Sequence, residues 1–258
     1  MSEARAAADH TDGSDRRGSD VDITSRFLLA VGEEVSGAAL EPEALARAAA
    51  TVLRVDGAGL STMVSVLRHP LAATDDECRQ SEELQTTLGD GPCLHAAEVH
   101  EAVVSDLPDL EARWPQYAEE LTRRTRFRSV ASVLLRGTGS GAFAALDLYS
   151  AGASLSDALD PADVAVVGRI AGALLATCME QLEDGGDSLD GGPEWYRSAS
   201  GRRRDVWVAV GMVMAGQRER TGNALSLLRA HAYSNSRSLD DVAADLINGQ
   251  LPLGELLD

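Results

Sequence analysis

The spacing of apolar residues changes several times along the first third of the chain. Residues 23–35 and 43–55 carry apolar side chains at helical intervals, and Pro42 stands at a first-turn position. Residues 59–68 alternate apolar and small polar side chains, as a half-buried strand does. Residues 75–88 are polar and compatible with a helix. The pattern therefore predicts two helices, then β structure, then a third helix.

The next part of the chain mixes strands with helices. Residues 102–106 form a short predicted strand, 114–124 an amphipathic helix, and 129–136 and 142–150 two strands joined by a glycine-rich turn. A long helix follows over 160–183, with an aspartate cap and a proline at its first position. The expected order is helix, helix, strand, strand, helix, strand, helix, strand, strand, helix. Consecutive strands joined by hairpins predict an antiparallel sheet with helices on one face, an α+β sandwich.

A change in composition separates this part from a smaller one. Residues 185–201 concentrate Gly, Ser and Asp around Pro193, which is typical of a linker. Beyond it we expect a small all-α bundle of three helices: the first from about Glu194 or Arg202, the second over 224–233, the third after Ser238. The predicted division is a disordered acidic tail at 1–22, a large domain at 23–184, the linker at 185–201 and the bundle at 202–254. Such a small bundle has a marginal core and is expected to lean on a partner or on an extended first helix.

Composition and charge narrow the classes of protein. The chain of 258 residues has a formal net charge of −18 and no lysine, so all 23 basic residues are arginine. The charge disfavours nonspecific attraction to nucleic acid or anionic membrane, and the missing lysine excludes a lysine nucleophile. Three scattered cysteines fit a reducing compartment. The apolar run at 164–179 is interrupted by Arg169, and the N-terminus lacks an apolar signal region, so we expect a cytoplasmic protein with no membrane partner.

Catalytic and metal-binding patterns are missing from the sequence. Cys93, His95 and His100 lie close together beside Asp90, but zinc sites usually show paired ligands and only one cysteine is present here. We expect Gly91 and the two residues after it to turn the chain into the sheet, with Cys93 packed inside as a small hydrophobe. No nucleophile elbow, phosphate-binding Walker loop or zinc-protease motif occurs. The sequence therefore predicts no enzyme, no metal and no cofactor.

The long helix over 160–183 carries two apolar stripes. One stripe runs through Val164, Val167, Ala171, Leu174, Cys178 and Leu182, and the other through Val166, Ile170 and Leu175. One sheet seldom needs both stripes of a surface helix, so we expect the second to pair with the same helix of another subunit, as a homodimer.

Three motifs in the large domain resemble a known family. They are "GDGPCLHAAEVHEAVVSDL", "RWPQYA" and "SVASVLLRGTGSGAFAALDLYS", in this order. Together with the order of elements, they make residues 25–182 closely similar to a GAF domain of the actinobacterial kind. The resemblance implies a sensor module with a central antiparallel sheet and, in some members, a pocket for a small molecule. The candidate sensor-pocket residues are Cys93, His95 and Tyr149, with an unknown small-molecule ligand.

The C-terminal helices resemble the ANTAR domain, an RNA-binding module of transcription antiterminators. The matching positions are Ala209, Gly211 and Met214 in the first helix, Ala224, Leu228 and Arg229 in the second, and Leu239, Val242 and Ala243 in the third. Val210 and Ser236 depart from the family, which has a basic and an Asn-like residue at these places. The resemblance implies that this segment acts on RNA.

The distribution of charge fits an RNA surface in the bundle. Residues 201–258 hold seven arginines and seven acids, 7 − 7 = 0, so the whole charge of −18 lies in the first 200 residues. Guanidinium groups bind phosphate and base edges, and a tyrosine can stack on an unpaired base. The candidate RNA-binding residues are Arg202, Arg203, Arg204, Arg229, Tyr233 and Arg237.

These observations predict a signal-responsive antiterminator whose two C-terminal bundles bind tandem hairpin loops in a nascent transcript, under the control of the GAF domain. Two alternatives remain. One is a scaffold whose helical tail binds a protein partner, and the other is a ligand or redox sensor built on Cys93. DNA binding is less favoured, because the third helix carries Asp240, Asp241 and Asp245 where a recognition helix needs donors.

Overall fold

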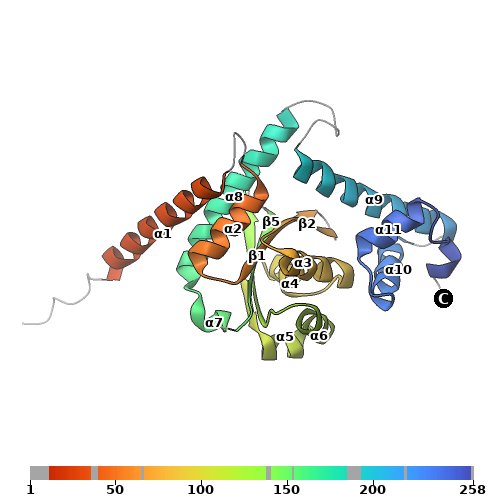
Figure 1. Cartoon of the computed structure of the whole chain (residues 1–258), viewed down its shortest axis with the longest axis horizontal. Helices are drawn as coiled ribbons and strands as arrows, with labels where there is room; N and C mark the ends of the chain where they lie inside the picture. The colour runs from red at the N-terminus through yellow and green to blue at the C-terminus, as the bar shows by residue number, and fades with distance from the viewer. Residues whose placement is uncertain are drawn as a thin grey trace, which may run out of the picture.

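The computed structural model describes residues 12–35, 40–64, 67–137, 141–152, 154–184, 193–217 and 220–256. The large domain contains α1 (Asp12–Glu34), α2 (Pro42–Leu53), β1 (Gly57–Val64), β2 (Leu67–Ala73), α3 (Asp76–Leu88), α4 (Pro92–Val99), β3 (Val103–Asp106), α5 (Leu107–Arg113), α6 (Pro115–Arg124), β4 (Ser129–Arg136), β5 (Ala142–Ser150), α7 (Leu155–Ala158) and α8 (Pro161–Asp184). The C-terminal bundle contains α9 (Glu194–Gln217), α10 (Thr221–Ser234), α11 (Leu239–Ile247) and the short 3₁₀ helix η1 (Leu253–Leu256). Figure 1 shows the two parts side by side.

A five-stranded antiparallel sheet in the order β2-β1-β5-β4-β3 forms the centre of the large domain. This confirms the predicted α+β class. Helices cover both faces of the sheet, however, and not one face as predicted. Leu148 points into the core beneath α1, α2 and α8, whereas its neighbour Tyr149 points into the core beneath α3 to α6. Side chains alternate along a strand, so two apolar cores need helices on two sides.

Two local predictions differ from the structure. Residues 59–68 do not form one strand, because β1 and β2 pair as an antiparallel hairpin and β2 starts at Leu67. Residues 91–93 do not turn the chain into the sheet, because Pro92 begins helix α4. A proline at the first helical position loses no hydrogen bond, and its fixed φ suits a helix start. Gly91 precedes it with φ of 138°, a conformation that glycine alone adopts easily.

Helices also extend into the predicted tail and linker. Helix α1 begins at Asp12, so the second half of the predicted tail is helical, while residues 1–11 lie outside the described part. Helix α9 begins at Glu194, so the linker ends eight residues earlier than its predicted limit of 201. Acidic residues in a first turn interact favourably with the helix dipole, and Glu194 is such a residue at the start of α9. Pro193, directly before it, has a fixed φ that suits a helix start.

Both apolar stripes of α8 are buried within the chain. Val164, Val167 and Ala171 of one stripe and Val166 and Leu175 of the other all belong to the core shared by α1, α2 and the sheet. The second stripe is therefore occupied by α1 and α2, and the argument that it needs a second subunit does not hold. By length and composition alone, residues 161–182 could cross a membrane. Part of this helix is buried against α1, α2 and the sheet.

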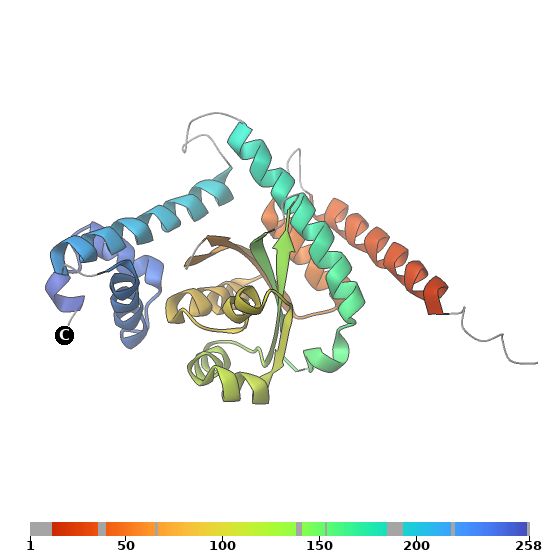
Figure 2. The same cartoon turned by 180° about the vertical axis from the view of Figure 1, so that it is seen from behind.

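The C-terminal bundle packs against the large domain. Helix α9 contacts β2, and α10 and α11 contact α3; both views show the bundle beside these elements (Figures 1 and 2). Leu67 of β2 is 1% exposed and belongs to the same apolar cluster as the bundle's own core residues. The bundle thus completes its core with a residue of the large domain, as expected for so small a unit.

Candidate functional site

The residues that match the ANTAR family build the interior of the bundle. The buried ones are Ala209, Ala224, Leu228, Leu239, Val242 and Ala243. Met214 packs against this core, and Gly211 is exposed. Ser238 caps α11 by accepting a hydrogen bond from the Asp241 amide at 3.0 Å, as its sequence position predicts. These small and apolar side chains let the three helices approach closely.

Val210 belongs to this core as well. It is 2% exposed and lies in the cluster that contains Leu67. A basic residue at this position would lose its hydration inside the bundle. Valine therefore suits the buried position that residue 210 occupies.

Two of the candidate RNA-binding arginines point into the contact between bundle and large domain. Arg203 of α9 donates a hydrogen bond to the hydroxyl of Thr62 on β1. Arg229 of α10 donates from Nε to the carbonyl oxygen of Thr86 on α3 at 3.2 Å. Burial lowers the pKa of both guanidinium groups, because water that would stabilise the charge is removed.

A glycine of the large domain makes room for Arg229. A Cβ atom on Gly89 would lie 2.4 Å from the Arg229 Nη1 atom, so the guanidinium would have to shift. Gly89 also ends α3 in a left-handed conformation with φ of 68°. The missing side chain at Gly89 thus leaves the space that the Arg229 guanidinium occupies in the contact between the bundle and α3.

The other arginines are placed differently. Arg202 forms an ion pair with Asp240 of α11, with Nε 3.5 Å from Oδ2, and Arg237 pairs with Asp245 of the same helix at 2.5 Å. Arg204 is exposed and lies 3.3 Å from the Asp205 carboxylate. Among the six candidate RNA-binding residues, the side chain of Arg204 is 68% exposed, and those of Arg202 and Arg237 are 42% and 36% exposed.

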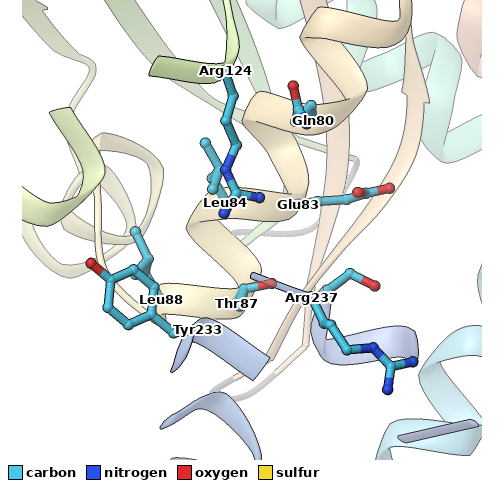
Figure 3. Close-up of a pocket in the computed structure, with 9 residues that line it drawn as sticks. Gln80, Glu83, Leu84, Thr87, Leu88, Arg124, Tyr233 and Arg237 are labelled. Carbon is cyan, nitrogen blue, oxygen red and sulfur yellow. The ribbon is translucent and has the colours of Figure 1, made fainter. Parts of the chain in front are cut away.

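Tyr233 faces the large domain too. It lines a small cavity of about 50 Å³ between α10 and α3, together with Leu84 and Leu88 of α3 and Arg124 of α6. Figure 3 shows its ring beside Leu88. In this position Tyr233 is partly covered by the large domain.

Threonines and an acidic pair complete the contact, and sequence reasoning missed both. The Leu239 amide donates to the Thr87 hydroxyl at 3.2 Å. Burial raises the pKa of Glu83 on α3 and of Asp240 on α11, and for Glu83 the negative charge of Asp240 raises it further. Residues 75–88 were interpreted only as a polar helix, and a helix that is polar all round gives no sign of which side is covered.

A second buried polar cluster lies inside the large domain, centred on Arg68 of β2. Its guanidinium contacts the carboxylates of Glu82 and Asp147, and all three side chains are fully buried. It also donates to the Glu82 carbonyl oxygen at 2.8 Å and, from Nε, to Cys93 Sγ at 3.1 Å. Burial alone would lower the pKa of Arg68, but the negative groups around it raise that pKa well above its usual value.

Further hydrogen bonds fix the two carboxylates. Ser61 and Tyr149 each donate to Glu82 at 2.5 Å, and Gln85 Nε2 donates to Asp147 Oδ2 at 3.0 Å. Burial raises the pKa of Glu82, and the charge of Arg68 opposes that rise. This cluster ties β1, β2, β5 and α3 together with charge-assisted bonds.

The cluster contains two of the three candidate sensor-pocket residues. Cys93 and Tyr149 both contact it, whereas His95 lies apart, with its ring 5.8 Å from that of Trp114. Burial raises the pKa of the Cys93 thiol, so at neutral pH the sulfur carries its proton and is a poor nucleophile. Among the described residues, no group of three metal-ligating side chains is placed to hold an ion.

One signal in the sequence could have revealed this cluster. Asp147 interrupts the apolar alternation of 142–150 between Leu146 and Leu148, and a charged residue in a buried strand requires a partner. The partner, Arg68, lies 79 residues earlier in the chain. No local spacing connects the two.

Comparison with known proteins gives a likeness in fold. No family model matches the sequence, and no curated protein matches it significantly. Among solved structures, the chain is similar to the GAF domain of a sensor histidine kinase from Pseudomonas syringae pv. tomato, with 18% identity, a TM-score of 0.41, and 67% of this chain and 100% of that chain covered. It is also similar to GAF domains of phosphoenolpyruvate-protein phosphotransferases. The one from Acinetobacter shows 11% identity and a TM-score of 0.44, with 64% and 98% covered. The one from Coxiella burnetii shows 14% identity and a TM-score of 0.45, with 64% and 96% covered.

Proposed function

We propose that the chain is a cytoplasmic GAF–ANTAR regulator, a signal-responsive transcription antiterminator that binds hairpin loops of nascent RNA. The observation that carries the proposal is the bundle α9–α11. Its buried core includes six of the residues that resemble the ANTAR pattern, and its arginines line the surface around that core. The protein acts by binding alone and performs no chemistry on the RNA.

The packing of the bundle supports a regulated activity. Arg203, Arg229 and Tyr233 face the large domain, so three of the six candidate RNA-binding residues are covered in this arrangement. A signal at the large domain that loosens the contact with β2 and α3 would expose these side chains. RNA that binds only the released bundle would shift the population in the same direction.

A homodimer is part of this proposal, since tandem hairpins call for two bundles. Helix α1 supports it, because Leu28 and Leu29 are 47% and 69% exposed on its surface. Light scattering on wild type and on Leu29→Asp measures the mass directly. A dimer that the substitution dissociates supports the proposal, and a monomer in both cases contradicts this part of it.

RNA binding is tested with the full chain and an RNA that carries two hexaloop hairpins, at two salt concentrations. The variant Leu67→Asp, which places a charge in the contact, should bind more tightly than wild type. Its affinity should fall with salt, because phosphate contacts release counterions. Adding Arg203→Ala and Arg229→Ala to this variant should remove the gain, whereas Arg113→Ala on the far helix α5 should not.

A second function is a scaffold whose bundle binds a protein partner. The observation in its favour is Val208, an apolar side chain of α9 that is 44% exposed beside the exposed Gly211. A protein partner would not produce the salt dependence of phosphate binding. If Leu67→Asp is folded and binds no RNA at low salt, the scaffold replaces the RNA proposal.

A further inference from the structure

The face of the sheet that carries α8 is covered unevenly. Helix α2 packs on β1 and β2, and α8 packs on β4, whereas β3 at the sheet edge lies beside the short helix α7. Val104, paired with Ala131 in the ladder, points to this face and is 38% exposed. Part of an apolar sheet face therefore remains open between α8 and the edge of the sheet.

Two glycines explain why α8 leaves this space. A Cβ on Gly168 would lie 2.8 Å from the Val133 Cγ1 atom, and one on Gly172 would lie 2.6 Å from the Arg136 carbonyl oxygen. These close approaches press the helix onto β4. A helix held so near to one strand cannot also cover the strand beyond it.

The space is a groove of about 870 Å³, within the range of small-molecule sites. Its apolar lining consists of Val104, Val133, Leu134, Leu155, Leu159 and Val164. Along α8 the lining extends from Pro161 to Ala173, thirteen residues, or about 18 Å at the rise of an α-helix. The groove is long and mostly apolar, which suits an extended alkyl chain.

Positive charge is gathered at one end of the groove. Arg136 donates to the His100 carbonyl oxygen at 3.5 Å, and Gly172 packs on the backbone of Arg136, so His100, Arg136 and Arg169 lie near one another. Arg169 is exposed and makes no ion pair with any described residue. Glu101 is the one carboxylate in the lining. The opposite end, at Leu155 and Leu159, is apolar.

We propose that this groove binds an amphiphile with a long alkyl chain and an anionic head, a long-chain carboxylate. The alkyl chain lies along α8 over Val133 and Val164, and the carboxylate meets the guanidinium groups of Arg136 and Arg169. Charge complementarity favours this occupant over a second copy of the chain, because the chain carries a net charge of −18 and an anion is attracted only where arginines gather. The site is separated from the Arg68 cluster by the sheet, and its occupancy does not depend on RNA binding.

Calorimetric titration of the full chain with tetradecanoate tests the proposal. Affinity should rise from octanoate to tetradecanoate by up to about fourfold for each added methylene, because each one is removed from water. Tetradecyltrimethylammonium, which has the same alkyl chain with a cationic head, should bind at least tenfold more weakly.

Two pairs of variants locate the site. Ala165→Trp, which fills the groove from the exposed surface of α8, should abolish binding, while Ala162→Trp on the same helix outside the groove should not. Arg169→Gln should weaken tetradecanoate about tenfold, the effect of losing one charge-assisted hydrogen bond. Arg113→Gln on α5 serves as the matched surface arginine. Thermal unfolding without ligand verifies that each variant is folded.

Three outcomes would overturn the proposal. They are no heat of binding with tetradecanoate, binding that Ala165→Trp leaves unchanged, and equal affinity for the anionic and cationic amphiphiles. If light scattering instead shows that Ala165→Trp alters the mass of the protein while tetradecanoate does not bind, the groove is an interface between copies of the chain and the proposal is wrong.

Discussion

Arg68 and Arg229 are both largely removed from water, but the pKa of the Arg68 guanidinium is raised and that of Arg229 is lowered. Arg68 meets two buried carboxylates, which raise the pKa of its guanidinium. Arg229 meets the carbonyl oxygen of Thr86, and burial lowers its pKa. Arg203 resembles Arg229, with a threonine hydroxyl as its acceptor. We therefore expect the Arg68 cluster to stay closed, and the contact around Arg203 to open more readily.

This difference follows from the cost of burying ions. A buried cation is stable only where opposite charge and hydrogen bonds replace its hydration. The Arg68 cluster meets that condition with Glu82, Asp147 and the bonds that hold them. At the bundle contact Arg203 gives up hydration for a neutral hydroxyl acceptor, and releasing the bundle would restore that hydration. We infer that the bundle is held on the large domain mainly by apolar burial around Leu67 and by the close fit of the two surfaces.

Replacing Arg68 should produce the largest effect. In Arg68→Met two carboxylates remain buried without a counter-charge, so the free energy of unfolding should fall by about 3–5 kcal/mol. Urea unfolding followed by circular dichroism measures it. Arg79→Met, at an exposed position of α3, is the control and should stay within about 0.5 kcal/mol of wild type. If Arg68→Met lowered the free energy of unfolding by less than about 1 kcal/mol, the Arg68 cluster would not differ from the bundle contact in the cost of burying its charge.

Leu67→Asp should release the bundle while the large domain stays folded. Leu67 is buried against the bundle and lies at an edge strand of the sheet, so the charge is tolerated only when the bundle moves away. Amide hydrogen exchange should become faster in α9–α11 and stay unchanged in β4 and β5. Val99→Asp, at an exposed apolar position, should change neither. Faster exchange throughout the sheet would show that the contact and the core are one cooperative unit.

Arg203→Met should have a much smaller effect than Arg68→Met. The methionine keeps much of the apolar stem and removes a charge whose desolvation was not repaid by a carboxylate. We expect the stability of the contact to change by less than about 1 kcal/mol, in either direction. The same hydrogen-exchange measurement on α9 checks it. A loss as large as that of Arg68→Met would mean that the Thr62 bond holds the bundle in place.

The contact is also expected to depend on pH. Burial, together with Arg203, Arg202 and Arg68, lowers the pKa of His69 from 6.5 to about 3. With the bundle released, burial and the two α9 arginines no longer act, so protonation favours the released form. The contact should weaken below pH 6.5, by up to about tenfold for each pH unit.

The variant His69→Gln should lack this dependence. Glu83 and Asp240 act in the opposite direction, because their pKa values are raised in the contact and their protonation favours the closed form. They are present in both proteins, so the difference between wild type and variant isolates His69. Hydrogen exchange in α9 at pH 6.5 and 5.5 measures it, and equal slopes would contradict the assignment.

Much of the framework could be predicted from local pattern. The α+β class, the strands at 129–136 and 142–150, and the cap at Ser238 follow from alternation, glycines and capping chemistry within short stretches. Helix α4 was missed because a proline after glycine is typical of both a turn and a helix start. The second stripe of α8 was assigned to a subunit contact because the sequence does not show that α1 and α2 fold back over it.

The sequence predicts which residues form the bundle, but not which side of the bundle faces the large domain. The small and apolar residues of the bundle are buried as a three-helix core requires. No spacing could show that Arg229 approaches Gly89, or that Leu67 joins the bundle, since these pairs lie far apart in the chain. The sequence shows which residues an RNA-binding bundle would use, and only the packing shows that the large domain covers several of them.

The most direct test of this account is the affinity of the full chain for tandem hairpin RNA, in wild type and in Leu67→Asp, at one fixed salt concentration. Covered arginines predict weak binding by wild type and at least tenfold tighter binding by the variant, with the gain removed when Arg203 and Arg229 are also replaced by alanine. Equal affinity of wild type and Leu67→Asp, with the release of α9–α11 verified by hydrogen exchange, would contradict the claim that the large domain controls the bundle.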